Sequence, residues 1–118
     1  MSSVTAQRPV DLAHLARYTA GETALNAEVL GLFVEQMAPL LRGFQESLET
    51  PDARVWRESA HALKGAALGI GAFALAEAAA DAESIDPATA PTSAARALRA
   101  LDLRCRVVRK FVAAYLGR

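Results

Sequence analysis

Residues 60–72 read AHALKGAALGIGA, and the spacing of the apolar side chains in this stretch determines the fold class. At about 100° per residue, an α-helix gathers Leu63, Ala67 and Ile70 on one side. The same stripe continues in both directions and comprises Trp56, Ala60, Leu63, Ala67, Ile70 and Ala74. A segment with this period is a helix with one buried face.

Helical spacing also dominates outside this segment. Residues 11–18 predict a short helix, and residues 23–48 predict a long one that Pro39 interrupts. An interior proline removes one backbone hydrogen bond, so we expect a kink near residues 35–38 or two shorter helices with one shared buried face. Alanine and leucine are abundant and β-branched residues are few, which favours an all-α fold.

The second half of the chain predicts two more helices. Thr50-Pro51-Asp52 is a start signal, because Thr50 can cap free amides and Pro51 suits the first helical position. The apolar pattern then continues to about Glu83, and prolines between residues 86 and 91 predict a loop before the last helix. We therefore expect an up-and-down four-helix bundle with a short N-terminal helix.

Composition limits the classes of function. The 118 residues, of which 53% are hydrophobic, fit one domain over residues 10–118 behind a flexible N-terminus at 1–9. Thirteen basic and thirteen acidic side chains balance, which argues against a nucleic-acid or membrane partner. One cysteine and two histidines predict no metal site. No signal peptide or membrane-length apolar run is present, so we expect a cytoplasmic protein.

His61 points away from the buried stripe of its helix. Within about 60° of its direction, at the same helical turn of about 100° per residue, lie Arg54, Arg57, Lys64, Gly65, Leu68 and Ala72. An exposed imidazole is largely unprotonated near neutral pH, so a ring nitrogen can act as a nucleophile. Phosphoryl transfer needs mainly positioning and positive charge, and Lys64 lies one turn from His61.

Glycine is unusually frequent beside His61. A helical glycine costs roughly 1 kcal/mol relative to alanine, so local stability does not explain Gly65, Gly69 and Gly71. Close approach by another molecule explains Gly65, whereas helix packing is the favoured reason for Gly71. Leu68 and Ala72 extend the surface as an apolar patch that a protein partner can cover, with Arg57 at its periphery.

These residues resemble the signature of histidine-containing phosphotransfer (HPt) domains. The resemblance is carried by HALKGAA at 61–67 followed by IGA at 70–72, and it extends to DLAHL at 11–15, the helix around Pro39 and the Thr50-Pro51 break. It covers the chain from about Val10 to the end. Alanines at 66 and 67 depart from the serines that the family often has, so a hydroxyl contribution is in doubt.

The resemblance implies a phosphocarrier of a bacterial-type two-component phosphorelay. His61 would accept a phosphoryl group from a receiver aspartate and pass it to another receiver, while Lys64 supports the phosphate and Gly65 leaves room beside the ring. The partners would be receiver domains of response regulators and hybrid histidine kinases. Such a domain has no ATP site and no cofactor of its own, and Mg²⁺ would come from the receiver.

Two other classes of function stay open. One is a helical binding module that docks a receiver or a histidine kinase without accepting phosphate. The other is an autonomous enzyme, which would need a pocket with convergent catalytic groups. His14 and Cys105 lie among apolar residues and are interpreted as structural, and the basic last helix as a solvated face or an aid to docking. Four helices can cover one another's apolar faces, which favours a monomer.

Overall fold

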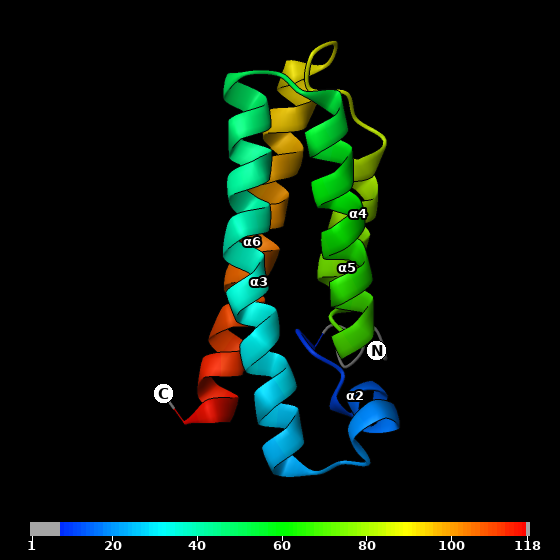
Figure 1. Ribbon diagram of the computed structural model, residues 1–118, viewed down its shortest axis with the longest axis vertical. Helices are drawn as coiled ribbons and strands as arrows, with labels where there is room; N and C mark the ends of the chain where they lie inside the picture. The colour runs from blue at the N-terminus through cyan, green and yellow to red at the C-terminus, as the bar shows by residue number, and fades with distance from the viewer. Residues whose placement is uncertain (1–7, 118) are drawn as a thin grey trace.

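The computed structural model describes residues 8–117, and all regular secondary structure in this range is α-helical (Figure 1). The elements are α2 (Leu12–Thr19), α3 (Thr23–Glu49), α4 (Ala53–Ile70), α5 (Phe73–Glu83) and α6 (Pro91–Leu116). The predicted all-α class is therefore confirmed. Residues 1–7 of the expected flexible N-terminus lie outside the described residues.

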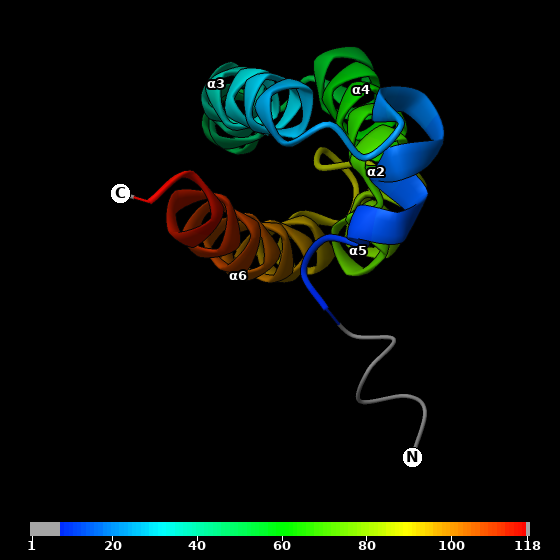
Figure 2. The ribbon, with the colours of Figure 1, turned by 90° about the horizontal axis from the view of Figure 1, so that it is seen from below.

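Four of these helices form a closed ring around the core. α3 packs against α4, α4 against α5, α5 against α6, and α6 returns to α3, whereas α4 and α6 lie diagonally opposite each other. Figure 2 shows this ring end-on, with α2 lying across one end, where it contacts α3 and α4. Each long helix thus keeps one face for the core and one face for solvent.

α3 is a single helix that continues through Pro39. The expected alternative, two shorter helices on either side of Pro39, is therefore not observed. Pro39 lies at an exposed position, whereas Phe33, Met37 and Leu41 on the other side are buried. The buried face therefore continues past the proline.

The predicted third helix over residues 50–83 is wrong, because the structure has two helices there, α4 and α5. The first ends at Gly71, which has φ +81°, a left-handed conformation that glycine adopts without a steric penalty. Its backbone N–H donates to the carbonyls of Ala67 and Leu68. The apolar period continues on both sides of the break, so periodicity alone did not reveal it.

Gly71 also joins the N-terminal segment to the bundle. The backbone N–H of Asp11 donates to the Gly71 carbonyl at 3.0 Å. A Cβ atom on Gly71 would lie 2.8 Å from the carbonyl oxygen of Asp11. The close approach to Asp11, which precedes α2, is therefore one reason for this glycine and its left-handed φ is another, whereas the predicted crowding against a neighbouring helix is not found.

The start of α4 differs by two residues from the prediction. Asp52, rather than Thr50, is the N-cap, and its carboxylate accepts hydrogen bonds from the N–H groups of Arg54 and Val55. Thr50 instead ends α3, where its own N–H donates to the Glu46 carbonyl. An aspartate satisfies free amides and also carries the charge that a helix N-terminus favours.

Trp56 is the largest fully buried side chain of the core. Its ring meets that of Phe44 edge-on, with centroids 4.9 Å apart. The indole Nε1–H donates to the backbone carbonyl of Ala82 at 2.8 Å. A single side chain of α4 thus contacts α3 and fixes the end of α5.

Candidate functional site

His61 lies on the solvent side of α4. Its side chain is 73% exposed, while Ala60 and Leu63 on the other side of the helix are completely buried. The prediction that this imidazole points away from the core is confirmed. An exposed ring on a convex helical surface can be reached by a reactive group of another protein.

Glu83 is the site residue that sequence reasoning missed. One carboxylate oxygen, Oε2, lies 3.2 Å from Nδ1 of His61, and the other, Oε1, accepts a hydrogen bond from Nζ of Lys64 at 2.8 Å. An unbroken helix would place residue 83 about 33 Å from residue 61, given a rise of about 1.5 Å per residue. The chain reversal at Gly71 brings Glu83 back beside His61. Only a prediction of that turn would have pointed to Glu83 as a site residue.

The electrostatics of this triad favour an ionised Glu83. The hydrogen bond from Lys64 is the largest cause that lowers the pKa of Glu83 below its ordinary value of 4.5, and the bond to His61 lowers it further, against partial desolvation. An ionised carboxylate only accepts hydrogen bonds. We therefore assign the ring hydrogen to Nδ1, which leaves the lone pair of His61 on Nε2.

Gly65 gives open space beside the imidazole. No heavy atom other than its own helix backbone and chain neighbours lies within 4 Å of the position that its Cβ would occupy. The same is true of Gly69, so neither glycine serves to pack against a neighbouring helix. Both lie at exposed positions along α4, and Gly65 is on the same side of the helix as His61.

The predicted docking residues have different positions in the structure. Leu68 is 45% exposed, and Arg57 is exposed as well. Ala72 is completely buried, so its prediction as a partner-binding residue is wrong. The prediction assumed an unbroken helix, whereas the chain turns at Gly71 and directs Ala72 into the core as the first residue before α5.

An apolar depression lies near the end of α4. It is an open hollow of about 420 Å³ between the C-terminal part of α4, the start of α3 and the short helix α2. The lining residues are Leu15, Tyr18, Thr19, Leu25, Val29, Gly69 and Ile70. Leu68 precedes Gly69 in the chain but does not line the hollow, so the exposed leucine and the hollow are separate apolar features.

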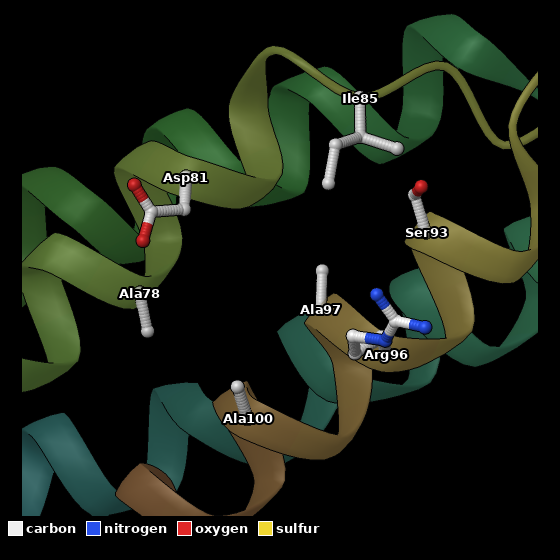
Figure 3. Close-up of a pocket in the computed structure, with 7 residues that line it drawn as sticks. All are labelled: Ala78, Asp81, Ile85, Ser93, Arg96, Ala97 and Ala100. Atoms are coloured by element: carbon white, nitrogen blue, oxygen red, sulfur yellow. The ribbon is translucent and has the colours of Figure 1, made fainter.

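A second depression of about 270 Å³ lies between α5 and α6 (Figure 3). Its lining residues are Ala78, Asp81, Ile85, Ser93, Arg96, Ala97 and Ala100. Neither this hollow nor the apolar one is lined by His61, Lys64 or Glu83. These two hollows are therefore separate from the site around His61.

The remaining candidate residues have structural surroundings. Cys105 is buried, and this burial raises the pKa of its thiol to about 11. The ring of His14 packs edge-on against Tyr18 and Phe73. Across residues 8–117, no three metal-ligating side chains form a group that could hold an ion. Nor does any helix in that range have the length and apolar character needed to cross a membrane.

Comparison with known proteins gives one match. The sequence model of a family described as "Hpt domain" matches residues 28–111, which is more than half of the chain. The matched region contains His61, Lys64, Gly65 and Glu83. No curated protein and no solved structure matches the chain.

Proposed function

This chain belongs to the Hpt domain family, and from that membership we propose that His61 accepts a phosphoryl group from a receiver-domain aspartate and passes it to a second receiver. Hpt domains have a phosphotransfer role in phosphorelays and carry the group without an ATP site of their own. The observation that carries the proposal is the exposed imidazole whose Nδ1 is bound to Glu83. The partners are receivers of response regulators and hybrid histidine kinases.

The chemical step uses the free nitrogen of His61. The Nε2 lone pair forms a bond to phosphorus while the bond from phosphorus to the aspartate oxygen breaks, and the electrons of that bond return to the carboxylate. The phosphorylated ring carries positive charge, and the ionised carboxylate of Glu83 stabilises it by accepting the Nδ1 hydrogen. Transfer to the second receiver reverses the step, so no proton has to leave the site.

Lys64 has two tasks in this proposal. Its ammonium has three N–H donors, and the hydrogen bond to Glu83 uses one of them. The other two can bind oxygens of the incoming phosphoryl group, whose transition state is strongly anionic. The same residue thus holds Glu83 in place and supplies positive charge to the phosphate.

The site is incomplete without its partner. A phosphoryl transfer site usually needs a metal ion to neutralise the phosphate, and we assign that Mg²⁺ to the receiver, together with the remaining catalytic groups. Gly65 leaves open space where the receiver's active site approaches. Leu68, which is 45% exposed two turns along α4 from His61, gives the receiver an apolar contact on the same side of the helix.

Phosphate transfer from a labelled receiver tests the proposal. A purified receiver phosphorylated with radiolabelled acetyl phosphate should transfer acid-labile, base-stable label to this chain. His61→Gln should abolish labelling while the helical circular dichroism stays unchanged. His14→Gln is the matched control, because it removes the other histidine of the chain and should keep the label.

The alternative function is a helical module that binds a receiver or a histidine kinase but never accepts phosphate. It predicts a complex in a binding assay and no transferred label from any donor. Retained labelling of the His61→Gln variant would instead contradict the choice of nucleophile. The paired carboxylate and ammonium beside the ring favour the carrier, because binding alone does not require them.

A further inference from the structure

Positive charge is concentrated on α6. This helix has one acidic residue, Asp102, and six of the chain's thirteen basic residues, which are Arg96, Arg99, Arg104, Arg106, Arg109 and Lys110. Because the whole chain is electrically balanced, the remaining part has an excess of acidic residues. The field around the molecule is therefore positive at α6 even though the net charge is zero.

The solvent face of α6 also carries two apolar side chains. Leu103 is 53% exposed and Val107 is 39% exposed, and they lie one turn apart on the helix. Exposed basic side chains surround this pair at Arg96, Arg99, Arg106 and Lys110. Apolar groups inside a charged rim are the usual anatomy of a protein interface.

The hollow between α5 and α6 lies beside this face. Figure 3 shows its small side chains at Ala78, Ala97 and Ala100, with Asp81 on α5 and Arg96 on α6. No ion pair is formed between Asp81 and Arg96. Both charged groups are therefore available to a partner. The hollow, with about 270 Å³, has room for one apolar side chain of that partner.

We propose that the hollow between α5 and α6 and the solvent face of α6 form a second docking surface, which binds an amphipathic acidic helix of a partner protein. An apolar anchor of that helix enters the hollow, and further apolar side chains cover Leu103 and Val107. Its carboxylates face Arg96, Arg99 and Lys110, and the forked guanidinium groups suit carboxylates. Arg106 already forms an ion pair with Asp102 at 2.9 Å. The position that faces Asp81 is neutral or basic.

Charge and shape favour a protein helix over other anionic partners. A nucleic acid would bind the same cations through its phosphates, but these would make no matching contact with the apolar pair Leu103 and Val107. A lipid surface would need a broad apolar face, whereas the wide apolar stripe of α6 is buried in the bundle core. Leu103 and Val107 alone are too small an area to anchor the molecule in a bilayer.

The second surface leaves the phosphorylation site free. α4 and α6 do not contact each other, and α5 separates the two sites. Glu83 leaves α5 toward Lys64 and His61 on α4, while Asp81 lines the hollow with α6. A partner held at α6 can therefore stay bound while a receiver docks at His61, which raises the local concentration of whichever domain is linked to it.

Binding of a model ligand tests this surface directly. The probe is a fluorescein-labelled amphipathic peptide in which leucines at helical spacing are flanked by glutamates, and the counter-probe has lysines in place of the glutamates. The full ¹⁵N-labelled chain should bind the acidic peptide, with amide shifts confined to α5 and α6 and none at His61. Single-stranded DNA and phosphatidylglycerol vesicles serve as competitors and should not displace it.

Two variants and two matched controls locate the site. Leu103→Ser and Lys110→Glu should each weaken binding of the acidic peptide about tenfold, as expected for interface positions worth more than 1 kcal/mol. Leu32→Ser on α3 repeats the change from leucine to serine, and Arg54→Glu on α4 repeats the reversal of charge. Both positions are exposed, and both variants should leave binding unchanged. Absence of peptide binding, shifts centred on His61, or displacement by DNA or vesicles would overturn the proposal.

Discussion

At the scale of single residues, the reactivity of His61 depends on which ring nitrogen is free. Glu83 occupies Nδ1 and leaves Nε2 toward solvent. A carboxylate behind an imidazole fixes its tautomer and orientation and stabilises the ring when it becomes cationic. In the proposed carrier, the direction of attack is therefore set by a residue that does not touch the phosphate.

Replacing Glu83 tests this role. In the proposed carrier, Glu83→Gln should lower the initial rate of phosphorylation by roughly ten- to hundredfold, the range found for partners that orient histidines. Asp81→Asn removes a carboxylate from the other side of α5 and should leave the rate unchanged. ¹⁵N spectra of the imidazole should show that Glu83→Gln also shifts the ring hydrogen from Nδ1 toward Nε2. An unchanged tautomer would contradict the positioning role.

The ionisation of Glu83 gives a second prediction at this scale. Its folded pKa is lowered, so the stability that its two hydrogen bonds contribute is present above about pH 4.5 and is lost as the pH falls through the lowered value. A carbon-detected titration should place the midpoint of Glu83 below 4.5. Lys64→Met should move it upward, because the largest stabilising hydrogen bond is removed, whereas Lys110→Met on α6 should leave it in place.

The sequence predicted the residues of the site only in part. His61, Lys64 and Gly65 lie within five consecutive residues of one helix, so helical geometry alone brings them together. Glu83 comes from another helix, and its position depends on a tertiary reversal that local spacing does not encode. Ala72 was misplaced for the same reason.

At the scale of helices, the break between α4 and α5 is the feature that builds the site. Gly71 combines φ +81° with a close approach to Asp11, and these are two separate reasons why no other residue fits. The periodic stripe did predict that residues 53–83 are helical, because the same side chains face the core on both sides of the turn. It could not predict the turn, because the sequence alone does not show whether a glycine lies inside a helix or ends it.

Substitution of this glycine should separate the two reasons. Gly71→Ala is expected to lower the free energy of unfolding by roughly 2–3 kcal/mol, from backbone strain plus displacement of Asp11. Gly21→Ala is the control with strain alone, since Gly21 has φ +76° and nothing lies within 4 Å of the point where its Cβ would be; its cost should be about 1 kcal/mol. Urea unfolding of both variants gives the comparison. Equal losses would show that the contact with Asp11 contributes nothing.

At the scale of the whole molecule, the core and the reactive surface share one contact. The indole of Trp56 donates to the carbonyl of Ala82, and Ala82 directly precedes Glu83 in the chain. The end of α5, and with it the carboxylate behind His61, is therefore held by a side chain of the core. The apolar stripe predicted that Trp56 is buried, but its hydrogen-bond partner depends on how the helices assemble.

A change at Trp56 should therefore affect both stability and transfer. Trp56→Phe removes the indole donor, while the Ala82 carbonyl keeps the backbone N–H of Ile85. The free energy of unfolding should therefore fall by roughly 0.5–1.5 kcal/mol, the net contribution of one hydrogen bond. Phosphorylation of the fraction that stays folded should also slow. Phe44→Leu disturbs the same packing but keeps the bond to Ala82, so at equal folded fraction its labelling rate should match that of the unchanged protein. A normal labelling rate in Trp56→Phe would contradict the proposed link between the core and the site.

The reversal at Gly71 also determines where the chain tolerates a change of length. One extra residue between Gly71 and Phe73 would turn every later side chain of α5 by about 100° and shift it along the helix by about 1.5 Å. The carboxylate of Glu83 would then point away from the imidazole even though every original amino acid was still present. An insertion at the exposed residues Ala88 and Thr89 leaves the register between α4 and α5 untouched. Alignment gaps among Hpt domains should accordingly collect after α5 and be absent between α4 and α5.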